Sequence, residues 1–255
     1  WVEAVGEGVT KVGAGQPVVV HAEYGCGQCP TCMSGNERYC PVIKPAGGAG
    51  LGIDGGLAEY IVAPARAVVA LPDGLDPVDA GPLDDAGLTP YHAIRTSMPW
   101  LEAGTVTTVI GIGGLGHLAV QILRAVSPTT IVAVEKDPGR RAFALELGAD
   151  VALDPEDDAA ARIKALAAAT GNHDGSSLVL DLVGADATLA LGAASAGRQG
   201  KLVCVGAALA ASPGGLSHLP WECVSQSTYS GEAWELEQLL ELAAAGKVKV
   251  SANNI

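Results

Sequence analysis

The stretch "TVTTVIGIGGLGHLAVQILRAV", residues 105–126, decides the fold. Its first half is a run of apolar and β-branched residues, which is typical of a strand buried on both faces of a sheet. Several glycines follow, and the apolar residues after them recur at helical spacing. A buried strand, a glycine-rich turn and a helix in this order predict the opening of a parallel α/β sheet.

The same alternation continues along the chain. Further strands are predicted in "TTIVAVEKD" (129–137), "VALDP" (151–155), "SSLVLDLVG" (176–184), "GKLVCVG" (200–206) and "STYSGE" (227–232). Helices are predicted in "GRRAFALELGAD" (139–150), "DDAAARIKALAAATG" (157–171) and "AWELEQLLELAAAG" (233–246). We therefore expect a doubly wound parallel Rossmann sheet over residues 79–246, preceded by an irregular β-rich region over residues 1–78.

The glycines after the first strand form a G-x-G-x-x-G motif at Gly111, Gly113 and Gly116, with Gly114 and Leu115 between them. In a strand–turn–helix context the first glycine makes the tight turn, the second admits a pyrophosphate, and the third lets helix and strand pack closely. The helix N-terminus offers free N–H groups to the anion. The motif therefore predicts a dinucleotide site.

An acidic residue is expected about 20 positions after this motif, where it would hold the ribose hydroxyls. Glu135, in "VAVEKD", has this position and would repel a 2′-phosphate, which favours NAD over NADP. Lys136, Arg140 and Arg141 stand nearby and weaken that preference. The alternative interpretation is that Glu135 is only a solvated strand end.

Four cysteines lie close together in "YGCGQCPTCMSGNERYC", residues 24–40, with the spacing C-x2-C-x2-C-x7-C. Thiolates at such short spacings can converge on one tetrahedral Zn²⁺. Disulfides or free thiols are the alternatives, but neighbours this close are difficult to pair without strain. Four sulfurs would fill the coordination shell of zinc, so Cys26, Cys29, Cys32 and Cys40 predict a structural site.

Composition excludes several classes of protein. The 255 residues carry a net charge of −13, and only 17% of them are charged. This balance argues against nucleic-acid and anionic-membrane partners, which need clustered Lys and Arg. No apolar run is long enough to predict a transmembrane helix, and the first residues do not have the pattern of a signal peptide. We expect a cytoplasmic protein.

The cysteine loop, followed by "PLDDAGLTPYHAI" and "VIGIGGLGHLAVQILRAV", resembles the zinc-containing, NAD-dependent alcohol dehydrogenases of the medium-chain family, and the bacterial secondary-alcohol branch in particular. The resemblance implies that the β-rich region is part of a GroES-like catalytic domain, to which residues 247–255 begin to return. It also implies zinc-assisted hydride transfer between an alcohol and NAD, and a homo-oligomer, either a dimer or a tetramer.

The resemblance carries several site residues. It matches Asp85 to a ligand of the catalytic zinc, although Asp84 adjoins it and Asp85 could instead cap the next helix. Cofactor-contacting positions of the family match a set of residues in this chain, namely Thr89, Arg140, Val183, Val205 and Gly206. His21 is interpreted as a packed or surface histidine, and His117 is expected near the pyrophosphate.

Other ligands of the family's catalytic zinc match no residue of this sequence, which resembles a dehydrogenase lacking its first and last segments. Two functions therefore compete. The first is an alcohol dehydrogenase with a small alcohol, ketone or aldehyde substrate. The second is a catalytically inactive fragment, or a non-catalytic protein, that binds NAD and zinc. The sequence does not indicate the particular alcohol, its chirality or the physiological direction.

Overall fold

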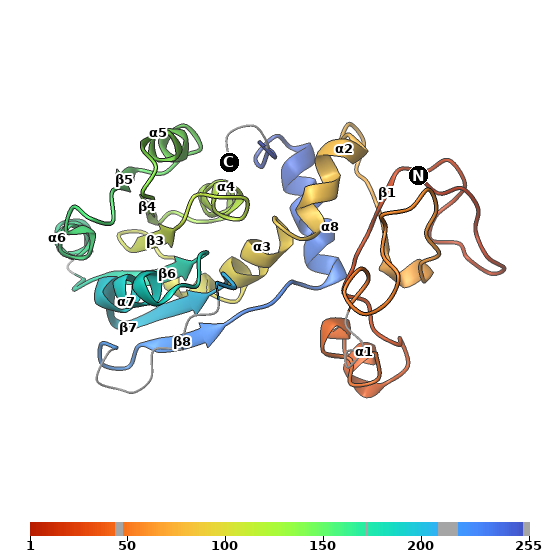
Figure 1. Cartoon of the computed structure of the whole chain (residues 1–255), viewed down its shortest axis with the longest axis horizontal. Coiled ribbons are helices and arrows are strands. Elements are labelled where there is room, and N and C mark those ends of the chain that lie inside the picture. Colours follow the sequence, from red (N-terminus) through yellow and green to blue (C-terminus); the bar gives the residue numbers. More distant parts are fainter. Residues whose placement is uncertain (44–47, 172, 209–218, 252–255) are drawn as a thin grey trace. The chain divides into compact units, whose positions relative to one another are not determined.

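The computed structural model describes residues 1–43, 48–171, 173–208 and 219–251 (Figure 1). The chain forms two compact units. Trp1–Leu88 and Ser230–Val248 make the first, and Thr89–Tyr229 with Lys249–Ile255 makes the second. The last helix, α8 (Ala233–Ala244), thus belongs to the first unit, whereas the sequence-based division placed residues 79–246 together.

The second unit contains a six-stranded sheet in the order β5-β4-β3-β6-β7-β8, and every neighbouring pair is parallel. Its strands are β3 (Val106–Ile110), β4 (Thr130–Val134), β5 (Val151–Leu153), β6 (Ser176–Asp181), β7 (Ala196–Cys204) and β8 (Val224–Ser227). The strand order reverses between β3 and β6, which is the topological switch point of a doubly wound sheet. The predicted α/β class is confirmed.

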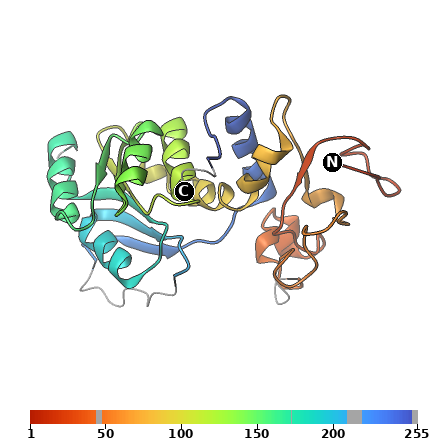
Figure 2. The ribbon, with the colours of Figure 1, turned by 45° about the horizontal axis from the view of Figure 1, so that its top comes forward.

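Helices connect these parallel strands, and Figure 2 gives a second view of their packing along the sheet. They are α4 (Gly116–Val126), α5 (Pro138–Glu146), α6 (Ala159–Gly171) and α7 (Asp186–Ser195), preceded by α3 (Leu88–Arg95) and the 3₁₀ turn η5 (Met98–Trp100). A core of fully or nearly buried side chains joins α6 and α7 to the strands, with Ile163 on α6 and Val132 and Val179 on the strands all at 0% exposure. All five residues of β3 are buried, as its apolar sequence predicts.

One predicted strand is wrong. The segment "STYSGE" (227–232) is not a strand, because β8 ends at Ser227 and Glu232 is the N-cap of α8. The backbone N–H of Glu232 donates to Glu235 Oε2 at 2.9 Å, which closes a capping box around the helix start. Ser230 has a φ of 46°, so a left-handed residue interrupts any extended run.

The first unit has less regular structure than its apolar sequence suggests. Its described part contains one antiparallel pair, β1 (Val18–Val20) with β2 (Val68–Ala70). Short helical turns make up the rest together with α8: α1 (Pro30–Met33), η1 (Glu37–Tyr39), η3 (Ala65–Ala67), α2 (Pro77–Ala80) and η4 (Gly81–Asp84). Turn residues and glycines occupy the remainder, so long loops rather than a sheet connect these elements.

Within the described residues, none of the helices combines the length and the apolar composition that crossing a bilayer requires.

Candidate dinucleotide and zinc sites

A cavity of about 490 Å³ lies in the second unit, at the carboxyl ends of β3, β4 and β6. Open α/β sheets bind ligands at this edge, beside the topological switch point. Most of the predicted cofactor residues line the cavity together: Gly111, Gly113, Gly114, Leu115, Gly116, Glu135, Lys136, Arg140 and Val183.

The glycines of the loop differ in what a side chain would meet. A Cβ on Gly116 would collide with the carbonyl oxygen of Gly111, so the start of α4 tolerates only glycine beside the turn. Gly111 itself has a φ of 89°, in the left-handed region. A Cβ on Gly113 would meet nothing within 4 Å, so this face of the loop is open to a ligand. No described side chain caps α4, so no side chain competes with an anion at its start, although the N–H of His117 already donates to the carbonyl of Gly113 at 3.1 Å.

Glu135 lies directly after β4 and is 7% exposed. One carboxylate oxygen, Oε2, accepts from the backbone N–H of Ile112 at 2.8 Å, and Oε1 accepts from that of Asp137 at 3.1 Å. These bonds fix the carboxylate against the glycine loop. A carboxylate oxygen has two lone pairs, so each oxygen keeps one for a further donor.

The basic residues near Glu135 divide into two groups. Arg141 donates to the carbonyls of Glu135 and Lys136 and to the carboxylate of Asp154, so its hydrogen bonds stabilise the backbone at the end of β4. Lys136 and Arg140 line the cavity instead, and they are the cations that a bound ligand would meet there.

The other predicted cofactor residues lie outside this cavity. Val205 and Gly206 follow β7, and their backbone N–H groups donate to the carbonyl of Asp181 at 2.8 and 3.0 Å. A Cβ on Gly206 would collide with the backbone of Val183, so these residues border the loop that does line the cavity. Thr89 is buried in α3.

Asp181 is a site residue that sequence reasoning missed. It ends β6 and is 0% exposed, and its Oδ1 accepts from the backbone N–H groups of Val183 and Gly184, both at 3.0 Å. Its Oδ2 accepts from the hydroxyl of Thr188 at 2.9 Å. The carboxylate therefore shapes the loop that presents Val183 to the cavity. The only signal for it was an acid at the end of "SSLVLD".

The four cysteines of the loop converge in the first unit. Their sulfurs all lie within 4.8 Å of one another, and all four residues are free thiols. Three Sγ–Sγ pairs are 3.4, 3.9 and 3.9 Å apart. Ligands at about 2.3 Å around a tetrahedral zinc are about 3.8 Å apart, so the donor set fits one structural ion.

The surroundings of the cysteine sulfurs shift the pKa of the thiol in opposite directions at Cys32 and Cys40. Burial raises the pKa of the Cys32 thiol to about 12. Burial also acts on Cys40, but backbone N–H groups, first that of Cys26, hold the pKa of its thiol at about 6. The loop is braced by Glu37, which accepts from the backbone N–H of Gly25 at 2.8 Å and from Arg66 Nε at 3.0 Å.

The two neighbouring aspartates of "PLDDAG" have different surroundings. Asp84 Oδ1 is 3.1 Å from His21 Nδ1, and its Oδ2 accepts from the backbone N–H of Ala22 at 3.2 Å. His21 is 2% exposed, so this pair ties η4 to the end of β1. Asp85 is exposed, and its carboxylate makes no hydrogen bond within the described residues. Across those residues, the cysteines are the one cluster of three or more metal-ligating side chains.

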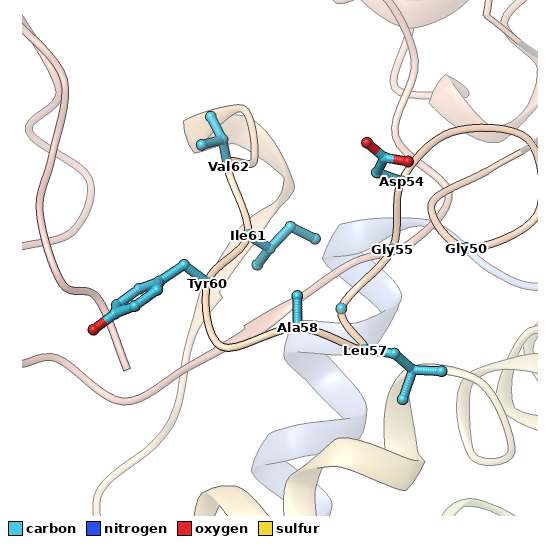
Figure 3. A pocket seen from close by; sticks show the side chains of 9 residues that line it. Gly50, Asp54, Gly55, Leu57, Ala58, Tyr60, Ile61 and Val62 are labelled. Atoms are coloured by element: carbon cyan, nitrogen blue, oxygen red, sulfur yellow. The ribbon is translucent and has the colours of Figure 1, made fainter.

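A larger cavity, of about 630 Å³, lies in the first unit beside residues 50–62 (Figure 3). Its lining is mostly glycine and apolar side chains, among them Leu57, Tyr60 and Val62, with Asp54 as its single carboxylate. None of the predicted site residues lines it, and among the residues that the structure describes no group of three or more metal-ligating side chains does, so size alone does not make this cavity the candidate site.

The fold and these sites define a dinucleotide-binding α/β unit joined to a lobe with a structural zinc loop. Two family profiles match the chain: "Zinc-binding dehydrogenase" over residues 114–244 and "Alcohol dehydrogenase GroES-like domain" over residues 1–73. An alcohol dehydrogenase of Geobacillus stearothermophilus is 39% identical over 58% of this chain and 42% of that protein. The D-arabinose 1-dehydrogenase (NADP(+)) of Saccharolobus solfataricus is 33% identical over 96% of this chain and 69% of that protein.

Among solved structures, the alcohol dehydrogenase of Aeropyrum pernix superposes with a TM-score of 0.86 at 32% identity, covering 98% of this chain and 71% of that one. The chain thus spans less than half of the Geobacillus relative and about 70% of the other two. It belongs to the zinc-binding medium-chain alcohol dehydrogenase family, whose cofactors are NAD or NADP.

Proposed function

We propose that the chain functions as an NAD-dependent zinc alcohol dehydrogenase whose substrate is a secondary alcohol or the corresponding ketone. The cavity at the carboxyl ends of β3, β4 and β6 carries this proposal, because the glycine loop, Glu135 and Val183 all line it. The competing function is a protein that binds NAD and zinc without turnover. Cytoplasmic location and a homo-oligomer, either a dimer or a tetramer, belong to the same proposal.

The residues around the cavity divide the work of holding a dinucleotide. When bound, the dinucleotide supplies the acceptor for the hydride that leaves the alcohol carbon. The open face at Gly113 and the uncapped start of α4 suit its pyrophosphate. Both oxygens of Glu135 retain a lone pair for the two ribose hydroxyls. Val183, 36% exposed, offers an apolar wall.

The charge of Glu135 supports NAD as the preferred cofactor. A buried carboxylate fixed by two backbone amides cannot turn away from an incoming 2′-phosphate, so it repels that group. Lys136 and Arg140 act in the opposite direction from the same cavity. We infer that the carboxylate dominates because its position is fixed, whereas long basic side chains are free to move.

The zinc chemistry differs between the two candidate positions. Cys26, Cys29, Cys32 and Cys40 would hold a structural ion, whose full coordination leaves no place for substrate. For a catalytic ion we propose Asp85 as one ligand, since it is exposed while Asp84 is occupied by His21. Among the described residues no group of three or more metal-ligating side chains includes Asp85, so they do not by themselves make a catalytic site.

Dinucleotide binding is the first test. We expect fluorescence titration to give a Kd for NADH at least about tenfold lower than that for NADPH, as one like-charge contact would produce. Glu135→Gln should narrow this ratio to about threefold or less. Glu146→Gln, which removes an exposed charge at the end of α5, is the matched control and should leave the ratio unchanged. Equal binding of both cofactors by the wild type would contradict the argument that the Glu135 carboxylate repels the 2′-phosphate of NADPH.

Alcohol oxidation is the second test, followed by NADH absorbance with 2-butanol, 1-butanol and a pentose sugar as alternative substrates. The proposal expects the highest kcat/KM with the secondary alcohol. A higher kcat/KM with the pentose sugar would show that the substrate class is a sugar and not a secondary alcohol. NADH binding without any turnover would support the competing function.

A further inference from the structure

Two buried polar side chains of α4 hold the backbone of a distant segment in the second unit. His117 and Gln121 lie one turn apart on the same face of the helix and are 1% and 7% exposed. Both bond to the backbone of residues 249–251, which follow α8 in the sequence. Within the chain, α4 begins at the glycine loop, so this face adjoins the candidate cofactor site. We call His117, Gln121 and residues 249–251 the latch.

Gln121 binds both main-chain groups of one residue. Its Nε2 donates to the carbonyl of Lys249 at 3.0 Å, and its Oε1 accepts from the N–H of Lys249 at 2.9 Å. Nε2 also donates to the carbonyl of His117 at 2.9 Å. The amide therefore pairs with Lys249 as a neighbouring strand would, and all of these bonds are buried or partly buried.

His117 is held in one tautomer by its two partners. Nδ1 is 3.1 Å from the carbonyl oxygen of Gly113, which can only accept, so Nδ1 carries the proton. Nε2 accepts from the backbone N–H of Ser251 at 3.3 Å, so Nε2 must keep its lone pair. The ring stacks on Phe143 of α5 with centroids 6.4 Å apart, which restrains its orientation.

The bond to Gly113 reaches the cofactor loop through a planar peptide. Because the peptide group is planar and trans, fixing the carbonyl of Gly113 also fixes the opposite direction for the N–H of Gly114. Both glycines line the cavity, and a Cβ on either would meet nothing within 4 Å, so this peptide faces open space there. The backbone N–H of His117 donates to the same Gly113 carbonyl at 3.1 Å, so the ring nitrogen supplies the second of two bonds that hold this peptide in place.

We propose that the latch couples dinucleotide binding at the glycine loop to the docking of residues 249–251 on α4. His117 acts as a positioning residue through the Gly113–Gly114 peptide, and it touches no substrate. The inference rests on the proposed dinucleotide site. Because coupling between sites is reciprocal, a bound dinucleotide stabilises the docked segment to the same extent that the docked segment tightens the dinucleotide.

Acid pH should open half of the latch. A protonated His117 would carry N–H on Nε2, facing the N–H of Ser251. The ring stacks on Phe143, which carries no charge, and its two nitrogens face the backbone groups of Gly113 and Ser251. Burial lowers the pKa of His117, against the smaller effect of the Gly113 and Gly114 carbonyls. The bond from Ser251 to His117 is therefore fully formed above about pH 6.5, the ordinary value for histidine, and is lost as pH falls through the lower folded pKa, while the bonds of Gln121 remain.

Three substitutions separate the bonds of the latch. Gln121→Met keeps the side-chain volume and removes both bonds to Lys249. His117→Asn keeps a donor for the Gly113 carbonyl and loses the Ser251 bond, whereas His117→Gln does the reverse. Ser127→Ala is the matched control, since it removes the 2.7 Å bond from Ser127 Oγ to the Leu123 carbonyl at the other end of the same helix.

The experiment combines NADH titration with amide hydrogen exchange at pH 8, on the full protein and its variants. We expect Gln121→Met and His117→Gln each to raise the Kd for NADH about five- to tenfold, which is the effect of one or two hydrogen bonds. NADH should slow exchange at Lys249 and Ser251 in the wild type but not in Gln121→Met. Lowering the pH to about 5.5 should reduce the protection of the Ser251 amide in the wild type, measured as its exchange rate relative to the intrinsic rate at the same pH, and this loss of protection should be absent in His117→Asn.

Two results would overturn the coupling. The first is wild-type NADH affinity in Gln121→Met, with circular dichroism confirming that the variant is folded. The second is exchange at Lys249 and Ser251 that NADH leaves unchanged in the wild type. Failure of the wild type to bind NADH at all is a different outcome, because it removes the proposed function itself.

Discussion

Asp181→Ala tests whether one buried carboxylate holds the loop beside the cofactor cavity. Asp181 is 0% exposed and accepts from the backbone N–H groups of Val183 and Gly184 and from the hydroxyl of Thr188. Alanine removes both acceptor oxygens and with them all three hydrogen bonds. Gly184 is buried, so its N–H finds no replacement among water molecules, whereas the more exposed Val183 can be rehydrated.

The expected loss of stability follows from these bonds. A hydrogen bond to a charged group contributes about 1.5–3 kcal/mol. The N–H of Gly184 loses its partner without compensation, whereas the hydroxyl of Thr188 still donates to the carbonyl of Ala185 at 2.9 Å. With smaller losses at Val183 and Thr188 added and the cost of burying the carboxylate recovered, the net loss is about 2–4 kcal/mol. With a urea slope of about 2 kcal/mol per molar, the unfolding midpoint of the second unit should fall by roughly 1–2 M.

Asp181→Asn is the matched control, since its carbonyl oxygen can still accept from both amides. Its NH₂ group can donate to Thr188 Oγ, whose hydroxyl still donates to the carbonyl of Ala185 at 2.9 Å. Only the charge is lost, and the cost should be about 1 kcal/mol. Urea unfolding followed by circular dichroism measures both variants. Equal losses in the alanine and asparagine variants, or a loss below about 1 kcal/mol in Asp181→Ala, would refute the argument.

Three further changes test other parts of the structure. Gly116→Ala places a Cβ against the Gly111 carbonyl oxygen, so overpacking should cost about 1–3 kcal/mol and NADH titration should show a large loss of affinity. Arg38→Met leaves Glu232, 3.0 Å away and buried, without its cation, which should cost about 3–5 kcal/mol in urea unfolding; adding Glu232→Gln should restore most of it. Burial raises the pKa of Glu232 even beside Arg38, so the deficit of Arg38→Met should shrink as acid protonates this carboxyl. Cys32→Ser should lower the zinc content measured by elemental analysis from about one ion per chain to none, and an unchanged content would contradict the structural site.

The sequence predicts the Rossmann unit well because its signals are local. Buried parallel strands read as apolar runs, and the glycine turn and the following helix occupy adjacent residues. The position of Glu135 could also be predicted from the sequence, since the spacing from the glycine loop to the next strand end is set by the length of one helix and one strand. The strand predicted at 227–232 failed because a capping box at Glu232 and Glu235 outweighed the β-forming residues before it.

The latch could not be predicted in the same way. Gln121 and its partner Lys249 are 128 residues apart, and His117 and Ser251 are 134 apart. A glutamine in an amphipathic helix is ordinary in any sequence, and nothing in its neighbours indicates that both its amide atoms meet one distant backbone. His117 was expected near the pyrophosphate, but it is buried on the side of α4 that meets Phe143 and the returning chain. Contacts of this kind follow from tertiary packing, which residue patterns do not encode locally.

Glu135 and Asp181 illustrate the limit of a sequence pattern most directly. Each is an acid at the carboxyl end of a parallel strand, and each binds two backbone amides. Asp181 binds both in the loop that follows its own strand, whereas Glu135 binds one in the glycine loop after β3 and one two residues further along its own chain segment. Glu135 lines the cavity and retains a lone pair on each oxygen, so it is able to recognise a ligand. Asp181 is fully buried and gives its second oxygen to Thr188, so it can only position the loop. The same residue type at equivalent strand ends thus acquires a binding role or a positioning role according to which groups surround it.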